Sequence, residues 1–326
     1  MKTSPKISIV VPTLNASQFI DKCLRAIYLQ KYPKNQLEVI VVDNYSTDNT
    51  LKIARQYPVK ILMNKFVDAQ ASKMVALRQA TGEYFIYLDA DIELVGKNWF
   101  NKMLEPLLDD ELVTGSFTRV LAQSSDSSIT RYLSYDPFQR DPIFQFLSPS
   151  VESTIIKSIG DYQICEYRLG KIPPTGLCLF RRKRLLKVWD PVKDKKYMEL
   201  DSLVRLVKVG YTRFAYVPSA QIHHPFLKDL KQLVQKRLKH IRKNYLKQDT
   251  PREYLWVDLR TFSGKVKVLL WVIYSSLIIP AFLYGIYKSI RYRDIVCMYE
   301  PVVTFVETWI IIYGFINGFV GDKSRV

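Results

Sequence analysis

Four short runs of apolar, mostly β-branched residues decide the fold. They are ISIVVPT at residues 7–13, EVIVVDN at 38–44, VKILMN at 59–64 and EYFIYLDAD at 83–91. Runs of this length and composition are typical of strands that are buried on both faces of a sheet. The sequence therefore predicts four strands in the first third of the chain.

Helical patterns lie between these runs. One apolar stripe at three- and four-residue spacing is formed by Ile20, Cys23, Leu24, Ile27 and Tyr28. Residues 48–56 and 68–80 are also expected to be helical, with Ser46 or Thr47 capping the former and Gly82 following the latter. Strands that alternate with helices predict a mostly parallel sheet between two helical layers, an α/β fold.

Polar residues follow three of the four runs. The first ends at Pro12-Thr13-Leu14-Asn15, the second at Asp43-Asn44-Tyr45-Ser46 and the fourth at Asp89-Ala90-Asp91. Because parallel sheets bind ligands at the carboxyl ends of their strands, we expect a site there. No G-x-G-x-x-G or Walker loop follows the first run, which disfavours a dinucleotide cofactor or P-loop chemistry.

The two aspartates of Asp89-Ala90-Asp91 are two residues apart, which is the spacing of side chains on one face of a strand. Alternate side chains of a strand point the same way, so Asp89 and Asp91 are predicted to converge on one cation. Carboxylate oxygens suit Mg²⁺ or Mn²⁺, which usually also binds substrate phosphates. The alternative is a turn in which the aspartates cap backbone groups.

Length and charge limit the class of protein. The 326 residues suggest about two domains. Lys and Arg number 48 against 31 Asp and Glu, and this excess of +17 indicates an anionic partner: nucleic acid, an acidic membrane or a phosphorylated substrate. The four cysteines are scattered, which argues against a disulfide scaffold or a zinc site and suits a reducing compartment. Residues 7–14 lack the pattern of a signal peptide, so we expect a cytoplasmic N-terminal part.

Two apolar segments lie near the C-terminus. Residues 268–287 carry no charge, and residues 301–320 carry only Glu307. Twenty helical residues span about 30 Å, the thickness of the hydrocarbon layer, so two membrane helices are predicted. Buried core helices are the alternative. The short basic stretch between them leaves open a full hairpin or a shallow re-entrant pair, and Pro280 is expected to kink the first helix.

A basic segment, residues 226–267, precedes them. Its twelve Lys and Arg against four Asp and Glu give +8. One apolar helical stripe is predicted from Leu227, Leu230, Val234, Leu238, Ile241 and Tyr245. A basic amphipathic helix suits an anionic membrane surface. An ordinary surface helix is the alternative, and nucleic acid is not an expected partner because no recognition motif accompanies the charge.

The runs SIVVPTLN, VIVVDNYSTDNT and ATGEYFIYLDAD, followed by MELDSLVRLVKVGYTRFAYVPSAQIHH, together resemble the family 2 glycosyltransferases, which have the GT-A fold. The resemblance covers roughly residues 5–225. It implies a GT-A domain over residues 1–225. The charge and hydropathy patterns place the basic interfacial segment 226–267 and the membrane segments within 268–326 after this domain.

The resemblance also implies roles for individual residues. The nucleotide is expected to contact Pro12, Thr13, Asn15 and Asp43, with Lys73 near the donor. Asp89 is expected to face the ribose or the metal, and Asp91 the metal, Mn²⁺ or Mg²⁺, that bridges the two phosphates. His224 matches a histidine that completes the metal shell in some members, and His223 occupies a position that is more often aromatic.

The general base departs from the family pattern, in which it is the Asp of a Glu-Asp pair. Met198-Glu199 stands in the place of that pair, so Glu199 is expected to be the base and Asp201 the alternate. A phosphate acceptor would need no base, and an acid-rich helix start is the structural alternative. Pro174-Thr175-Gly176 takes the place of the family's glycine-containing acceptor segment. The Q-x-x-R-W motif of processive synthases is absent, which favours transfer of one sugar.

The sequence thus leads us to expect an inverting, metal-dependent transferase at the cytoplasmic face of the cell membrane, acting in glycan or glycolipid assembly. Its donor would be a UDP- or GDP-linked sugar, and its acceptor lipid-linked, of the polyprenyl-phosphate type. A catalytically silent membrane scaffold is the alternative. A nucleotidyltransferase is disfavoured because PTLNAS replaces a glycine-rich loop.

Overall fold

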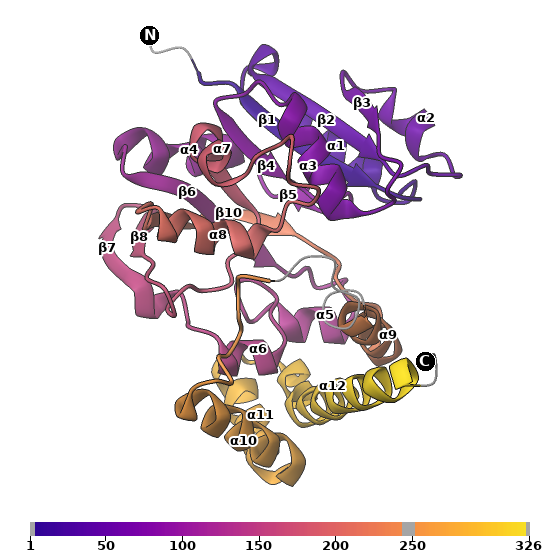
Figure 1. Ribbon diagram of the computed structural model, residues 1–326, viewed down its shortest axis with the longest axis vertical. Helices are drawn as coiled ribbons and strands as arrows, with labels where there is room; N and C mark the ends of the chain where they lie inside the picture. Colours follow the sequence, from indigo (N-terminus) through magenta and orange to yellow (C-terminus); the bar gives the residue numbers. More distant parts are fainter. Residues whose placement is uncertain (1–3, 243–251, 324–326) are drawn as a thin grey trace. The chain divides into compact units, whose positions relative to one another are not determined.

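The computed structural model describes residues 4–242 and 252–323, and it divides into two compact units (Figure 1). The first unit comprises residues 1–121 and 150–224, and the second comprises residues 122–149 and 225–326. The expected boundary at residue 225 is therefore close to the observed one. Residues 122–149, which the sequence placed within the first domain, group instead with the C-terminal unit.

The first unit is built on one mixed sheet of ten strands. Its strands are β1 (Ile7–Thr13), β2 (Leu37–Asp43), β3 (Lys60–Met63), β4 (Tyr84–Tyr87), β5 (Glu93–Leu94), β6 (Val113–Leu121), β7 (Ile155–Ile159), β8 (Tyr162–Glu166), β9 (Cys178–Arg181) and β10 (Arg213–His223). They are ordered β3-β2-β1-β4-β9-β6-β10-β8-β7, and β5 pairs with β10. The pairs of β1 with β2 and β4, and of β2 with β3, are parallel, as the alternation of strands and helices predicted.

Helices accompany the strands of this sheet. They are α1 (Ile20–Tyr28), η1 (Lys34–Gln36), α2 (Thr50–Ala54), α3 (Ala69–Gln79), α4 (Trp99–Asp109), η2 (Glu152–Thr154), α7 (Arg182–Val188) and α8 (Glu199–Lys208). The predicted stripe of α1 is buried in one core cluster with α4 and with the odd-numbered residues of β1. Helix α3 packs on β1 and β2 with side chains outside that cluster, so it covers the other face. The three-layer prediction is confirmed.

Gly82 lies where the chain enters β4 and passes close to β1. A Cβ at this position would lie 2.5 Å from the backbone nitrogen of Ser8. The Gly82 N–H donates to Ser8 Oγ at 2.8 Å. The glycine is therefore required by this close approach, since no side chain fits between the two segments.

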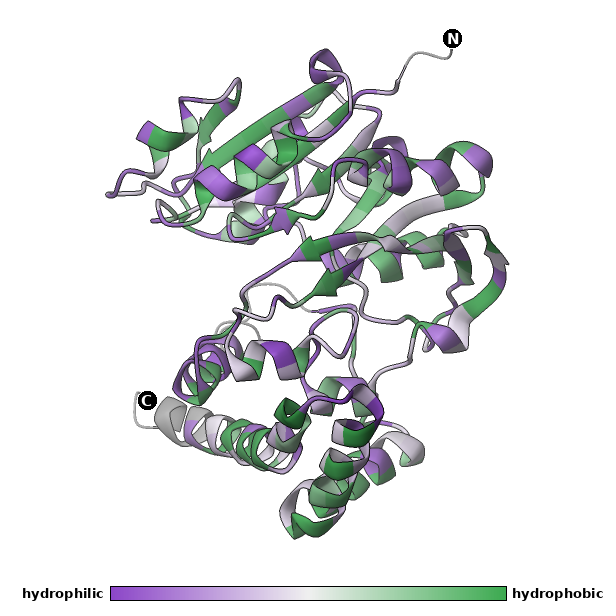
Figure 2. Cartoon of the chain, turned by 180° about the vertical axis from the view of Figure 1, so that it is seen from behind, coloured by the Kyte–Doolittle hydropathy of each residue, from purple (hydrophilic) through white to green (hydrophobic). Residues whose placement is uncertain are grey.

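The second unit is helical. It contains α5 (Ser128–Leu133), α6 (Pro142–Leu147), α9 (Leu230–Ile241), α10 (Phe262–Leu277), α11 (Ile279–Tyr292), η4 (Ile295–Tyr299) and α12 (Glu300–Lys323). Figure 2 shows that hydrophobic residues are prominent on the C-terminal helices α10, α11 and α12. One span, Ile295–Asn317, is long and apolar enough to cross a membrane, although 44% of its apolar window is buried inside the unit.

The predicted membrane segment 268–287 is not one helix. Helices α10 and α11 meet at Ile278, which has φ 61° and ψ −47°, and the chain bends there by 82°. Pro280 stands at the start of α11 and has no N–H to continue the hydrogen bonding of α10. This is the kink that the proline led us to expect.

The apolar stripe predicted for the basic segment is shifted in the structure. The buried residues of α9 are Leu233, Arg237 and Ile241, while Leu230, Val234 and Leu238 lie at the margins of that face. Leu227 is buried but precedes the helix. Tyr245, the last member of the predicted stripe, lies outside the described residues.

Candidate functional site

The loops after β1 and β2 are joined by a buried carboxylate. Asp43, with no exposed surface, accepts hydrogen bonds from Thr13 Oγ1 at 2.9 Å, from Ser46 Oγ at 2.6 Å and from Ser46 N at 2.7 Å. Register places Thr13 directly opposite Asp43, beside the buried Pro12. The structure therefore gives Asp43 protein partners and a part in shaping the edge. Its expected contact with the nucleotide stays a prediction.

Asn15, in the loop after β1, also connects that loop to the loop after β2. Its φ of 50° lies in the left-handed region, which Asn tolerates better than most residues. Its N–H donates to Ser46 Oγ at 2.8 Å, and its Oδ1 accepts from Thr47 N at 2.9 Å. Tyr45 also has a positive φ, 61°, and its side chain is exposed at this edge. The side chain of Asn15 is thus used to hold two loops in place.

A hydrogen-bonded network of two asparagines and Ser72 supports the start of α3. This network was not predicted from the sequence. Asn64 Nδ2 donates to Asn44 Oδ1 at 2.9 Å and to Ser72 Oγ at 3.0 Å, and Ser72 Oγ donates to Asn44 Oδ1 at 3.0 Å. Asp68 caps the helix by accepting from Gln70 N and Ala71 N. The signal was available, because each asparagine is the last residue of a predicted strand. The network fixes the turn of helix that carries Lys73.

Lys73 is almost fully buried, rather than the exposed helical lysine that is the commoner case. Its side chain is 6% exposed, and Nζ lies 3.4 Å from the centre of the Tyr87 ring and 3.8 Å from Asp89 Oδ1. The Asp89 side chain is half exposed. A buried ammonium beside an accessible carboxylate at the carboxyl end of β4 provides positive charge where a donor's phosphates are expected.

Asp89 and Asp91 follow strand β4 and do not form part of it. The strand β4 ends at Tyr87, and the two residues lie in a turn in which Ile92 N donates to Asp89 O at 3.0 Å. Asp89 faces Lys73, whereas Asp91 Oδ2 lies 3.6 Å from His224 Nε2. Among the described residues, no three His, Cys, Asp or Glu side chains are grouped closely enough to hold a metal ion.

The residues near Asp91 nevertheless fit a divalent cation. Pairing of β5 with β10 brings His223 opposite Glu93, with Nδ1 3.7 Å from Glu93 Oε1, and sets His224 beside Asp91. One carboxylate and one imidazole leave coordination positions for phosphate oxygens and water, as is usual where a cation binds with its substrate. Of the three ligands expected from the sequence, Asp91 and His224 lie beside each other and Asp89 faces Lys73; the binding of one cation by these residues stays a prediction.

Glu199 stands at the first position of α8, next to the Pro174-Thr175-Gly176 segment. Its Oε1 accepts from Cys178 N at 3.4 Å, and a Cβ on Gly176 would lie 3.6 Å from its Oε2. The residue keeps part of its surface accessible, while loss of water around the carboxylate raises its pKa to about 7. The positive charge of Lys73 and the backbone N–H groups of Leu177 and Cys178 oppose this rise. Asp201, the expected alternate, is only 3% exposed.

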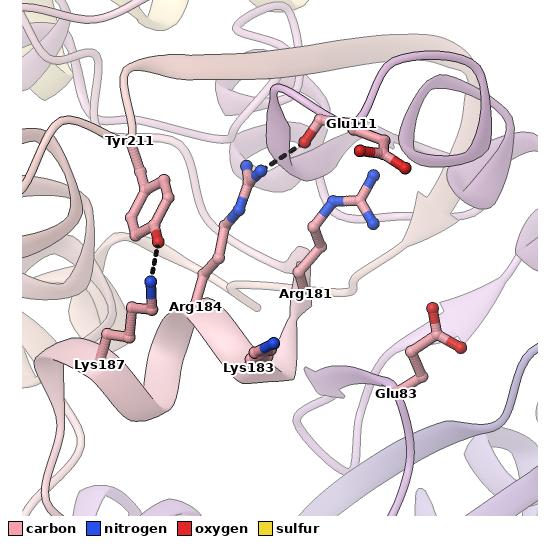
Figure 3. A pocket seen from close by; sticks show the side chains of 7 residues that line it. All are labelled: Glu83, Glu111, Arg181, Lys183, Arg184, Lys187 and Tyr211. Carbon is pink, nitrogen blue, oxygen red and sulfur yellow. Dashed lines mark hydrogen bonds between the residues drawn. The ribbon is translucent and has the colours of Figure 1, made fainter.

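A separate cavity of about 390 Å³ lies at the opposite edge of the sheet (Figure 3). It is lined by Glu83, Glu111, Arg181, Lys183, Arg184, Lys187 and Tyr211. β9 runs antiparallel to β4, so its end at Arg181 adjoins the amino end of β4. The two arginines donate to backbone carbonyls, Arg181 to Val113 at 2.8 Å and Arg184 to Leu112 at 2.9 Å. These cations are engaged in structure and are remote from Asp91.

Comparison with known proteins identifies the family of the N-terminal half of the chain. The sequence model of "Glycosyl transferase family 2" matches residues 8–158, which include β1, β4, Asp43, Lys73, Asp89 and Asp91. Residues 8–158 therefore form a family 2 glycosyltransferase domain. The resemblance drawn from the sequence is confirmed.

Two relatives are similar to part of this chain, and one solved structure is similar to nearly all of it. A poly(ribitol-phosphate) β-N-acetylglucosaminyltransferase, TarS, of Staphylococcus aureus is 37% identical over 92 residues, 26% of this chain and 16% of its own. A dolichyl N-acetyl-α-D-glucosaminyl phosphate 3-β-D-2,3-diacetamido-2,3-dideoxy-β-D-glucuronosyltransferase of Methanococcus voltae is 32% identical over 91 residues, 26% of this chain and 28% of its own.

The solved structure supports the fold. A mannosyltransferase of Pyrobaculum calidifontis, in complex with GDP-mannose and Mn²⁺, aligns over 98% of this chain and 90% of its own, with a TM-score of 0.50 and 18% sequence identity. At this identity the likeness establishes the GT-A-like fold. The chain spans less than a third of the length of both relatives, so their activities are not transferred to it by similarity alone.

Proposed function

We propose that this protein transfers one sugar from a nucleoside-diphosphate sugar to a membrane-associated, lipid-linked acceptor, with inversion at the anomeric carbon. The observation that carries the proposal is the set of charged residues at one edge of the sheet of a family 2 domain. There, Lys73 pairs with Asp89, Asp91 lies beside His224, and a partly accessible Glu199 has a pKa near neutrality. UDP and GDP donors are both compatible with it.

The donor side is assigned to the loops after β1, β2 and β4. Pro12, Thr13, Asn15 and Asp43 shape the place for the nucleotide, and Lys73 supplies positive charge to the phosphates. Asp91 and His224 would hold Mn²⁺ or Mg²⁺, with Asp89 close to the ribose or the phosphates. When bound, the cation neutralises charge on the departing diphosphate.

The acceptor side is assigned to the start of α8. Glu199 in its ionised form takes the proton of an acceptor hydroxyl while that oxygen attacks the anomeric carbon. The bond from the anomeric carbon to the diphosphate breaks as the new bond forms on the opposite face, which inverts the configuration. For an acceptor whose attacking oxygen already belongs to a phosphate, no proton has to be removed, and Glu199 then orients the acceptor.

The membrane assignment rests on the second unit. It has one helix of sufficient length and apolarity to cross a bilayer, a bent apolar pair and a basic helix. An acceptor with a polyprenyl chain would be presented at such a surface, and the dolichyl N-acetyl-α-D-glucosaminyl phosphate in the name of the Methanococcus voltae relative is of this chemical class. We propose that the family 2 domain works at the cytoplasmic face of the cell membrane.

The test is a donor screen on the full chain in detergent. UDP- and GDP-sugars are supplied with Mn²⁺ or Mg²⁺, with and without a polyprenyl phosphate, and released nucleoside diphosphate is measured. Release that requires both metal and lipid is expected, and Asp91→Asn should nearly abolish it in a folded protein. Silence on all donors by a folded wild-type protein would favour the catalytically inactive scaffold, whose support is the replacement of the family's Glu-Asp pair by Met198-Glu199.

A further inference from the structure

Helices α10 and α11 form a wedge whose tip is apolar and whose two ends are basic. Around the bend, the side chains of Leu277, Ile278, Ile279, Phe282 and Leu283 are 45–68% exposed. Lysines 265 and 267 stand near the start of α10, and Lys288, Arg291 and Arg293 stand near the end of α11. Apolar side chains exposed in this number mark a surface that contacts something other than water.

The length of the wedge matches half a bilayer. Residues 268–277 and 279–287 are the uncharged parts of its two arms, and at 1.5 Å per residue they measure about 15 and 14 Å. With a bend of 82°, a symmetric wedge reaches about 10 Å below its basic ends. The hydrocarbon layer is about 30 Å thick, so the tip stays within one leaflet. Because both ends are basic, both fit the same headgroup surface.

Helix α12 has two distinct faces. Its exposed apolar side chains recur at three- and four-residue steps: Val302, Phe305, Trp309, Tyr313 and Ile316. The other face is buried in the unit and carries Glu300, Thr304, Glu307 and Thr308. A helix with one apolar face outward and a polar face held by protein has the pattern of a helix that lies in the plane of an interface.

The polar face of α12 is anchored by ion pairs to neighbouring helices of the same unit. Lys288 Nζ lies 2.7 Å from Glu300 Oε2, and Arg237 of α9 lies 3.1 Å from Glu307 Oε1. A Cβ on Gly314 would lie 2.9 Å from Ile241 of α9, so α9 and α12 are in close contact there. In a membrane that binds this unit, helix α12 would therefore lie at about the same depth as α9.

The contact between α9 and α12 argues against a helix α12 that crosses the whole bilayer. Glu307 is near the middle of the candidate span Ile295–Asn317, so in a crossing helix it would lie near the bilayer centre together with Arg237. Lys236 and Lys239, within one turn of Arg237, are exposed on α9 and would enter the same region. Charged side chains facing hydrocarbon are strongly disfavoured.

We propose that the second unit is a one-leaflet membrane platform. The α10–α11 wedge inserts into the leaflet, the outer stripe of α12 rests on the acyl boundary, and the exposed lysines and arginines of α9, α10 and α11 meet acidic headgroups. The chain enters and leaves on the same side and does not span the bilayer. This inference rests on the membrane attachment proposed above and specifies its form.

Attachment and topology are tested separately. Full-length protein is mixed with vesicles of neutral lipid or of neutral lipid with acidic phospholipid, and the bound fraction is measured by flotation. Ile279→Glu with Phe282→Glu should weaken binding to the acidic vesicles at least tenfold. Leu112→Glu, which alters an equally exposed leucine of the first unit, should not. Lack of binding by the wild type, or equal binding by the wedge variant, would overturn the platform; assembly into dimers without vesicle binding would assign the apolar surface to a second copy of the chain.

Topology is read from single introduced cysteines at Arg293 and Asn317, which stand on either side of the candidate span. The four native cysteines are buried. A membrane-impermeant maleimide should label both positions from the side that carries the first unit, and from that side only. Labelling of the two positions from opposite sides would refute the one-leaflet arrangement while leaving attachment, and the donor screen, unaffected.

Discussion

Replacing Glu199 by Gln removes the proposed base while keeping the size and hydrogen-bonding capacity of the side chain. With a pKa of about 7, the ionised fraction of Glu199 is about one eleventh at pH 6, about half at pH 7 and about ten elevenths at pH 8. For a hydroxyl acceptor, kcat/KM of the wild type should therefore rise about tenfold from pH 6 to pH 8. The rise follows ionisation, because only the carboxylate accepts a proton.

The Gln variant should lose both the rate and its pH dependence. Removal of a general base costs about 10²- to 10⁴-fold in rate, or about 3–5 kcal/mol of transition-state stabilisation. The assay is nucleoside diphosphate release at saturating metal between pH 5.5 and 8.5, with donor affinity measured in parallel. Glu199→Asp is the matched control, since it ionises but is one methylene shorter, and it should keep a pH-dependent rise at a reduced rate. A Gln variant with more than about a tenth of the wild-type rate and the same rise would refute the base assignment.

Three further changes follow from the same contacts. Lys73→Met removes a positive charge that lowers the pKa of Glu199, so the rising limb of the pH–rate profile should move to higher pH; a limb that stays in place would show that the two groups do not interact. His224→Ala should raise the Mn²⁺ concentration needed for half-maximal turnover by about 10-fold or more, and His223→Ala by less, because His224 lies beside Asp91 whereas His223 lies beside Glu93. Gly82→Ala should lower the free energy of unfolding by about 1–3 kcal/mol in a denaturation experiment, because its Cβ would overlap Ser8; an unchanged midpoint would contradict that packing.

The sequence was sufficient for the alternating part of the fold. Strands β1 and β2 are continuous apolar runs and helix α1 has a clear apolar stripe, and their predicted positions are close to the observed ones. The expected site residues follow these strands. Asp89-Ala90-Asp91 lies in a turn beyond the end of β4, so the alternation of a strand does not apply there, and the convergence of the two aspartates stays a prediction.

Long-range contacts account for the remaining differences. Residues 122–149 have no periodic pattern of their own. They join the second unit through contacts such as the ion pair of Asp141 with Arg237, which also pairs with Glu307. The buried face of α9 includes Arg237, which an apolar stripe cannot reveal because its burial depends on acidic partners far along the chain. Pro280 predicted the break at Ile278, but the angle between α10 and α11 is set by packing.

The configuration of the product tests the central claim most directly. A donor whose sugar is α-linked to the diphosphate is supplied with metal and the acceptor identified by the screen, and the anomeric coupling of the product is read by proton NMR before mutarotation or work-up. A single in-line displacement with Glu199 behind the attacking oxygen predicts a β-linked product. An α-linked product, with configuration retained, would contradict the one-step mechanism and the role given to Glu199.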